Sequence, residues 1–444
     1  DLEQFAPATG DKPDFFVRKS IDSVLSLKAE THNFPTTVEP FNGAATGTGG
    51  EIRDRMAGGR ASVPLAGTAV YMTSYPRTAA DRPWEQYSAA RPWLYQTPRQ
   101  ILTKASNGAS DFGNKFGQPL ICGSVLTFEH EGKGDEPTYG FDKVIMLAGG
   151  VGYARRSDAQ KGTPEPGEEV VLLGGDNYRI GMGGGAVSSV NTGQYAGAIE
   201  LNAVQRSNPE MQKRVENVIR TLSESEDNPI ISIHDHGAGG HLNCLSELVE
   251  TTGGHFDLSA FPIGDETLSS KEIIGNESQE RMGLLVKGDA VERIARIAER
   301  ERAPMYVVGR TTDDMHLTFE EAGGDKPIDL ALSDMFGSAP KTYMVDKHID
   351  KTYPALSYDA ARVEHYLDEV LQQEGVACKD WLTNKVDRSV TGRVARQQCQ
   401  GEIQLPLSDC GAMAVDFRGR AGIATSIGHA PVAALVDPVA GSQL

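Results

Sequence analysis

The sequence predicts an α/β protein made of several units, and three observations lead to that class. Short apolar runs that suit strands alternate with segments whose apolar residues recur at helical spacing. Glycine-rich stretches follow several of these runs directly, as ligand loops do in α/β proteins. The chain has 444 residues, and at about 150 residues per domain this length predicts about three units.

The first predicted unit covers residues 21–160 and follows a polar leading segment, residues 1–20, that we expect to be a linker. Residues 24–27 form a short apolar run, which is typical of a buried strand. A segment rich in glycine and threonine, 43–50, is expected to be a loop, and residues 144–147 predict another strand.

The second predicted unit covers residues 161–325 and begins with a stretch rich in proline and glycine, which marks a domain boundary. A proline at the first helical position and an apolar stripe predict a helix at 209–223. The other predicted elements are strands at 170–173, 230–233 and 282–286 and a helix at 289–301.

Residues 326–358 contain Gly, Pro and Asp without a period and predict a connection to a third unit, 359–444. That unit starts with a predicted helix at 359–373, and its last apolar run, 430–436, has the pattern of an unfinished strand. The chain also begins without methionine. We therefore expect it to be an internal piece of a longer polypeptide, with the third unit truncated.

Charge and composition exclude several partners. The formal net charge of −18 disfavours nonspecific binding to nucleic acids or anionic membranes, because phosphates would be repelled. No apolar run approaches the roughly 20 residues that cross a bilayer, and the N-terminus lacks the features of a signal peptide. The five cysteines form no CxxC pair, which is typical of a reducing compartment. We therefore predict a cytoplasmic protein.

The first candidate site lies in residues 28–54. Glu30 and His32 end a predicted strand, and the small residues after them would let backbone N–H groups approach an anion. Glu30 and Asp54 offer the oxygen ligands that Mg²⁺ prefers, and the pKa of a histidine such as His32 suits proton transfer. The alternative is a solvated loop beside an edge strand, since the stretch matches no phosphate-loop or dinucleotide-binding signature.

Two further segments are candidates on weaker grounds. Residues 174–186 follow a predicted strand and contain many glycines, which favours a ligand-facing or tightly packed loop over a flexible turn. Residues 276–281 precede a predicted strand and are either part of a site or a solvated turn.

A cluster of His234, His236 and His241 beside Asp235 suggests zinc. The glycines between these histidines break any helix that would give them ligand spacing, so neutral, hydrogen-bonded or surface histidines are the preferred interpretation. Asp235, at the end of a predicted strand, is the better ligand, for Mg²⁺.

Taken in order, these motifs resemble the synthetase part of the phosphoribosylformylglycinamidine synthase family in its large, single-chain form. The resemblance implies a PurM-like fold of tandem αβ units, with the first pair complete and the second truncated. It is carried by residues 28–35, 40–54, 145–150, 181–186, 204–211, 233–235, 237–240, 276–281, 387–392 and 406–410.

The resemblance implies an ATP-dependent C–N ligase of purine biosynthesis. In that family ATP phosphorylates the amide oxygen of formylglycinamide ribonucleotide (FGAR). Ammonia then displaces the phosphate from the iminophosphate to give the amidine, FGAM. The ammonia comes from glutamine through a glutamine amidotransferase domain elsewhere in the chain. Mg²⁺ is the implied cofactor, and large members also hold a structural ADP.

The family's motifs imply residue roles, and His32 matches the catalytic position. The implied Mg²⁺ ligands are Glu30, Asp54, Asp235 and Asp409. The implied substrate-binding positions are His32, Asn33, Arg53, Gln205, Glu277, Ser278 and Gln279. The implied nucleotide-binding positions are Lys28, Gly43, Ala44, Ala45, Thr46, Gly47, Thr48, Gly49, Gly50, Glu51, Ile52, Arg53 and Asp54, with Lys379 and Ser408 at the second, ADP-binding site.

The sequence departs from the family's pattern in two ways. Phe34 stands where the family usually has a second histidine, so any substrate contact from that imidazole is absent. The family's upstream Ser-Glu-His-Cys motif and its glutaminase site have no match, so we expect this segment to be inactive alone. Two other classes remain open: a noncatalytic nucleotide-binding scaffold, and a zinc hydrolase built on the histidine cluster.

Overall fold

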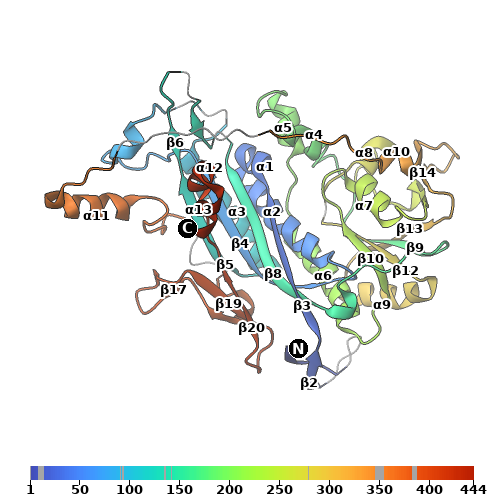
Figure 1. Ribbon diagram of the computed structural model, residues 1–444. Helices are drawn as coiled ribbons and strands as arrows, with labels where there is room; N and C mark the ends of the chain where they lie inside the picture. Colours follow the sequence, from blue (N-terminus) through green and yellow to red (C-terminus); the bar gives the residue numbers. More distant parts are fainter. Residues whose placement is uncertain are drawn as a thin grey trace.

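Figure 1 shows the chain as a computed structural model in which two sheets, each with its own helices, lie side by side. A smaller C-terminal part flanks the first sheet. In the part of the chain that the structure describes, no helix is long and apolar enough to span a bilayer. The described residues are 2–8, 15–90, 92, 95–134, 137–141, 143–278, 280–345, 355–382 and 388–444.

The first unit contains a four-stranded sheet on which two helices pack. Its strands are, in spatial order, β3 (Ser23–Thr31), β8 (Ile145–Arg155), β4 (Val63–Thr73) and β5 (Leu120–Thr127). β4 and β5 run parallel, and the other neighbours are antiparallel. A short β6–β7 ladder (Glu129–His130 and Tyr139–Gly140) lies outside this sheet. The helices are α1 (Asn33–Val38), α2 (Pro40–Met56) and α3 (Pro98–Phe116).

Strand β3 lies at the edge of this sheet, and the expected burial of residues 24–27 is wrong: Val24 and Ser26 are only half-buried, and the other two are exposed. The side chains of Leu25 and Leu27 are 74% and 77% exposed. Successive side chains of a strand point to opposite faces. One face of this edge strand is therefore left uncovered by the part of the chain that the structure describes.

The segment 43–50, expected to be a loop, lies inside helix α2. Its glycines allow close packing. A Cβ on Gly43 would lie 2.4 Å from the Pro35 carbonyl oxygen, and one on Gly49 would lie 2.7 Å from the Phe112 ring of α3. In this helix glycine is therefore needed because it has no side chain at two close contacts, one with a backbone and one with a ring. Its ability to adopt loop conformations plays no part here.

The second unit contains a seven-stranded, mostly antiparallel sheet, in which only β11 and β14 pair in parallel. The predicted strands at 170–173, 230–233 and 282–286 and the predicted helices at 209–223 and 289–301 are confirmed. The strands are, in spatial order, β10 (Ile230–Asp235), β12 (Met282–Val286), β9 (Glu169–Leu173), β13 (Met305–Thr311), β11 (Gly254–Asp257), β14 (His316–Glu320) and β15 (Ile328–Ala331). The helices are α4 (Gly184–Ser188), α5 (Gly197–Ala203), α6 (Pro209–Glu224), α7 (Gly240–Leu248), α8 (Ser270–Ile274), α9 (Val291–Glu301) and α10 (Leu332–Met335).

The two units share one hydrophobic core. Ile52 and Met56 of α2 and Phe112 of α3 belong to the same buried cluster as Val215 and Ile219 of α6. The cluster continues onto one face of the seven-stranded sheet, while α7 covers the opposite face in a second cluster. The sheets are thus joined through helices α2, α3, α6 and α9.

Three further segments differ from their predicted structure. The leading segment forms a hairpin of β1 (Leu2–Pro7) and β2 (Phe16–Ile21). The predicted connection contributes β15, which pairs with β14 and extends the second sheet beyond residue 325. Residues 430–436 form helix α12 (Pro431–Val436), because proline at the first position starts a helix and donates nothing to a strand ladder.

The C-terminal part packs against the first sheet. Met413, of strand β19 (Cys410–Ala414), lies in a buried cluster with Leu65 and Ile121 of the first unit. The predicted helix at 359–373 is confirmed as α11 (Val363–Gln372), which extends from the body of the molecule in Figure 1 and buries none of its residues. The remaining elements are β16 (Val394–Arg396), β17 (Cys399–Gln400), β18 (Leu405–Pro406), β19 (Cys410–Ala414), β20 (Gly422–Ser426) and α13 (Pro438–Gln443).

Candidate active site

The end of strand β3 presents Lys28, Glu30 and His32 in a row. Alternate residues of a strand share one face, and this face meets helix α2. A Cβ on Gly47 would lie 3.0 Å from the His32 ring, and one on Gly50 would lie 3.0 Å from Glu30 Oε1. Glycine on this helix face therefore makes room for the two functional side chains.

Asp54 lies at the same place, one turn further along α2. Its carboxylate pairs with Lys28, whose Nζ is also 3.5 Å from Glu30 Oε2. Asp235, at the end of β10 in the second unit, completes a group of three carboxylates. Burial and the neighbouring Asp54 charge raise the pKa of Glu30 to about 8 and the pKa of Asp235 to about 6.

Two cations offset this negative charge only partly. The Lys28 ammonium forms ion pairs with Glu30 and Asp54, and Arg53 Nε is 3.8 Å from Asp235 Oδ2. Within the described residues, no group of three or more His, Cys, Asp or Glu side chains is arranged to hold a metal ion by itself.

His32 is held as a neutral imidazole. Burial and the Arg53 charge lower its pKa to about 4. Its Nδ1 atom is buried and has no hydrogen-bond partner in the described part of the chain. Asn33 is engaged differently, because its Oδ1 accepts a hydrogen bond from the Met146 backbone N–H at 3.0 Å.

Arg53 joins the two units at this site. Its guanidinium is 3% exposed, its Nη1 pairs with Glu280, and the same nitrogen donates to Gln212 Oε1 of α6 at 2.9 Å. Glu280 and Gln212 were missed as individual site residues by sequence reasoning. Glu280 lies in the motif 276–281, but nothing in the sequence of α6 distinguishes Gln212 from other helix residues.

The rest of the 43–54 stretch turns away from the carboxylate group. Ala44, Ala45 and Ile52 are fully buried among apolar side chains. Glu51 Oε2 accepts from Arg55 Nε, and Glu51 Oε1 accepts from Gln118, both at 2.7 Å. A helix shows one face to a site, so only part of the implied nucleotide-binding stretch meets β3. Thr46 and Thr48 are also buried.

The second glycine-rich segment is placed beside Glu277 and Ser278. Glu277 Oε1 accepts hydrogen bonds from the backbone N–H groups of Gly185, at 3.3 Å, and Gly239, at 3.0 Å. A Cβ on Gly181 would lie 3.0 Å from Gln205 Cγ and 3.3 Å from Ser278 Cβ. The structure thus brings together three of the implied substrate-binding residues. Gln279 lies outside the described residues.

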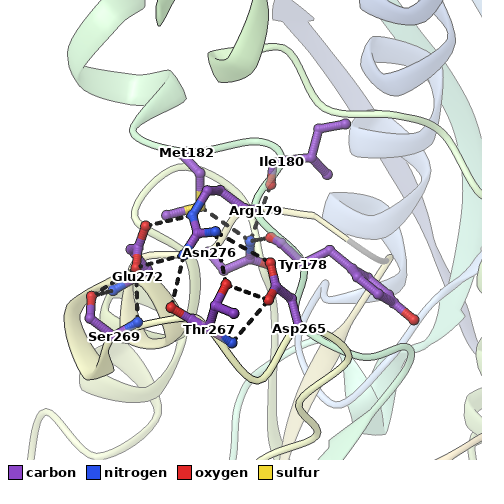
Figure 2. A network of polar contacts seen from close by, with 9 residues as sticks. All are labelled: Tyr178, Arg179, Ile180, Met182, Asp265, Thr267, Ser269, Glu272 and Asn276. Atoms are coloured by element: carbon purple, nitrogen blue, oxygen red, sulfur yellow. Dashed lines mark hydrogen bonds and ion pairs between the residues drawn. The ribbon is translucent and has the colours of Figure 1, made fainter.

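Figure 2 shows how this loop is tied to its neighbour. Asn276 Nδ2 donates to the Tyr178 carbonyl at 2.6 Å and to the Ile180 carbonyl at 3.1 Å. Arg179 pairs with Glu272 at 2.9 Å. Residues 174–186 are therefore a held loop rather than a flexible turn, with α4 beginning at Gly184.

The histidine cluster forms no metal site among the described residues. His236 Nε2 is 3.0 Å from His241 Nδ1, and His241 Nε2 is 3.1 Å from Asn177 Oδ1. Asn177 Oδ1 also accepts from Arg281 Nη1 at 2.7 Å. Burial lowers the pKa of both histidines well below its usual value. The preferred interpretation of neutral, hydrogen-bonded histidines agrees with this network.

Phe34 has a packing role. It lies in a buried cluster with Val38, Val187, Ala203 and Val204, where α1 meets α4 and α5. The residue that departs from the family's pattern therefore fixes the segment after His32 against the second unit.

The second implied nucleotide site coincides with a cavity of about 360 Å³ between the first sheet and the C-terminal part. Lys379, Ser408 and Asp409 line it, together with Arg388. Burial lowers the pKa of Lys379. Arg388 Nε and Nη1 are buried and have no hydrogen-bond partner in the described ranges. The cavity therefore offers unused donors to an anion.

The fold and this site agree with two matches to known protein families. The AIR synthase related protein, C-terminal domain, matches residues 165–321, and the FGAR-AT PurM_N-like domain matches residues 378–444. These matches give the class of the two segments, PurM-like domains of the AIR synthase related type.

Within that class, the chain corresponds over nearly its whole length to a segment of the phosphoribosylformylglycinamidine synthases, which confirms the family resemblance. It is 40% identical to the Homo sapiens phosphoribosylformylglycinamidine synthase over 458 residues, which cover 99% of this chain and 34% of that protein. The chain thus spans about a third of the length of the curated relatives it matches.

Solved structures support the fold. T. maritima PurL complexed with ADP has a TM-score of 0.65 at 21% identity, covering 95% of this chain and 58% of that one. T. maritima PurL complexed with FGAR has a TM-score of 0.61 at 23% identity, covering 79% of this chain and 53% of that one.

Proposed function

We propose that this chain supplies part of the active site of an ATP-dependent ligase that converts FGAR to FGAM. Ammonia from the glutamine amidotransferase activity of the whole enzyme is its nitrogen source. The observation that carries the proposal is the convergence of Glu30, Asp54 and Asp235 beside Lys28 and Arg53. The curated relatives named phosphoribosylformylglycinamidine synthase support the reaction, and the solved PurL complexes with FGAR and ATP support the substrates. We also propose a cytoplasmic location, because the five cysteines form no disulfide in the described part of the chain.

The donor set of this site suits Mg²⁺. Three carboxylates supply only oxygen ligands, and burial, together with the neighbouring Asp54 charge, raises the pKa of Glu30 and of Asp235. Mg²⁺ commonly takes one or two protein carboxylates and completes its shell with water and substrate phosphates. Glu30, Asp54 and Asp235 would hold the ion, which supplies charge neutralisation for phosphoryl transfer when bound.

The residues around the carboxylates would perform complementary steps. Lys28 and Arg53 would balance the negative charge on the transferred phosphoryl group. Phosphoryl transfer is catalysed mainly by such charge balance and by positioning of the reacting groups. The attack of ammonia on the iminophosphate carbon breaks the C–O bond to phosphate and releases a proton. His32 is neutral, and its buried Nδ1 has no hydrogen-bond partner among the residues that the structure describes, so it would accept that proton.

We also propose that the cavity beside Lys379 binds the phosphates of a second nucleotide, ADP. Lys379 and Arg388 would contact the phosphates, and Asp409 would hold Mg²⁺. The proposal rests on the unused Arg388 donors and on the sequence match of Lys379, Ser408 and Asp409 to the family's second site.

The experiment that tests the main proposal is an ATP- and FGAR-dependent ammonia incorporation assay on the natural full-length protein. We expect turnover in the wild type and a loss of at least about a hundredfold in His32→Asn, since general acid–base groups contribute about 10²–10⁴-fold. His316→Asn, on the distant strand β14, is the matched control and should retain turnover. A wild-type protein without FGAR-dependent phosphate release, or a fully active His32→Asn variant, would refute the assignment.

A further inference from the structure

We propose that Glu280 and Gln212 are positioning residues for Arg53. They hold one guanidinium nitrogen so that the opposite edge is presented to the phosphate of a substrate. This inference rests on the proposed function, since it specifies how the second unit prepares a binding group of the first.

Both residues contact the same atom of Arg53 from the second unit. Arg53 Nη1 pairs with Glu280 Oε2 and donates to Gln212 Oε1 at 2.9 Å. Gln212 is fully buried, and its Nε2 donates to the Gly49 carbonyl of α2 at 3.0 Å. Gln212 therefore fixes the helix that carries Arg53 as well as the guanidinium itself.

Glu280 is itself held in place. Its Oε1 accepts a hydrogen bond from the Asn208 backbone N–H at 2.9 Å, at the start of α6. Its backbone has a φ of 51°, a left-handed conformation that is uncommon for a residue other than glycine. Such conformations persist where the surroundings over-determine them, and they cluster at functional sites.

The remaining edge of Arg53 is free to bind a ligand. Within the described residues, neither Nε nor Nη2 makes a hydrogen bond, and Nε is buried. The nearest carboxylate oxygen to Nε, on Asp235, is 3.8 Å away, which is beyond hydrogen-bond distance. The Nε–Nη2 edge of an arginine matches two oxygens of a phosphate in a bidentate pair.

If Arg53 served only to join the two units, its Nε–Nη2 edge would also be expected to make hydrogen bonds within the protein. A buried guanidinium nitrogen without a partner is costly. The structure leaves that cost uncompensated at Nε while two acceptors share Nη1. A phosphate of FGAR or of ATP would satisfy the unused donors.

The test measures binding by calorimetry, with FGAR and the nonhydrolysable ATP analogue AMPPCP titrated separately into the natural full-length protein. In Gln212→Met the side chain keeps its approximate size but loses both hydrogen bonds. In Glu280→Gln the charge that pairs with Arg53 is removed. We expect each substitution to weaken binding of one of the two ligands about tenfold, as expected for the loss of a hydrogen bond to a charged group. The ligand affected identifies the phosphate that Arg53 receives.

A control separates positioning from general stability. Glu216→Gln breaks another ion pair of a buried carboxylate on α6, to the half-exposed Lys213 at 2.7 Å, and should leave both affinities unchanged. If Glu280→Gln fails to fold, Gln212→Met still gives the result. Unchanged affinities in folded Gln212→Met would overturn the inference, and a wild type that binds neither ligand would overturn the proposed function with it.

Discussion

At the scale of single residues, burial decides which groups carry charge. His241 is an example, because its two ring nitrogens face His236 and Asn177 inside the second unit. Asn177 Oδ1 is an acceptor, so His241 Nε2 carries the proton and Nδ1 accepts from His236. A second proton on His241 would have no acceptor and would face the charge of Arg281, which also lowers its pKa.

This arrangement predicts a pH dependence of stability. The pKa of His241 in the folded chain lies well below 6.5, so below about pH 6.5 the unfolded chain binds more protons at this residue. The stability is present above that pH and is lost as the pH falls, by at most about 1.4 kcal/mol per pH unit for one proton. Urea unfolding between pH 5 and 7.5 should therefore show a smaller slope in His241→Gln than in the wild type. Equal slopes in both proteins would contradict the argument.

At the scale of the element, helix α2 shows that glycine can indicate packing as well as a loop. Three of its glycines meet neighbours that a methyl group would displace or crowd: Gly43 the backbone of Pro35, Gly47 the His32 ring, and Gly49 the Phe112 ring. Helix α3, which packs against α2, also has a glycine at a close contact: a Cβ on Gly108 would lie 1.9 Å from the Phe41 carbonyl oxygen.

We predict that Gly108→Ala lowers the free energy of unfolding by about 1–3 kcal/mol, the usual cost of overpacking. Alanine in place of glycine in an open helix position would instead stabilise by about 0.5–1 kcal/mol. The control is Lys104→Ala on the exposed side of α3, which should change stability by less than about 0.5 kcal/mol. Chemical denaturation measures both variants, and a stabilised Gly108→Ala would show that α2 and α3 are not in close contact.

At the scale of the whole molecule, the shared core makes the two sheet units one cooperative structure. Ile52 of α2 is fully buried in the cluster that includes Val215 and Ile219 of α6. Arg53, the next residue, makes its polar contacts to the same unit. Apolar burial and the site chemistry thus depend on the same interface.

We predict that Ile52→Ala destabilises both units together, by about 2–5 kcal/mol. The chain's three tryptophans all lie outside residues 161–325, whereas circular dichroism reports on both sheets. Unfolding curves from fluorescence and from circular dichroism should shift by the same amount and coincide. The control is Val363→Ala on α11, whose side chain is exposed and should leave both curves in place. Separate transitions would mean that the units unfold independently.

The sequence by itself determined the elements with strong periodicity, because local pattern carries that information. Helices α6 and α9 and strands β9, β10 and β12 follow from apolar spacing that any partner surface would require. The motifs around Glu30, His32 and Asp235 identified the family. Their residue types are suited to binding phosphates and a metal ion, and this can be recognised without knowing the geometry of the site.

Only the tertiary structure decided which face each residue shows. It turned the segment 43–50 into a helix, because close contacts with Pro35 and Phe112 exclude larger side chains while the core buries Ala45 and Ile52. It left Leu25 exposed on an edge strand, since none of the described segments covers that face of β3. It also brought Gln212 to Arg53 across 159 positions of sequence. Such contacts depend on how helices pack against one another, and no local pattern records that packing.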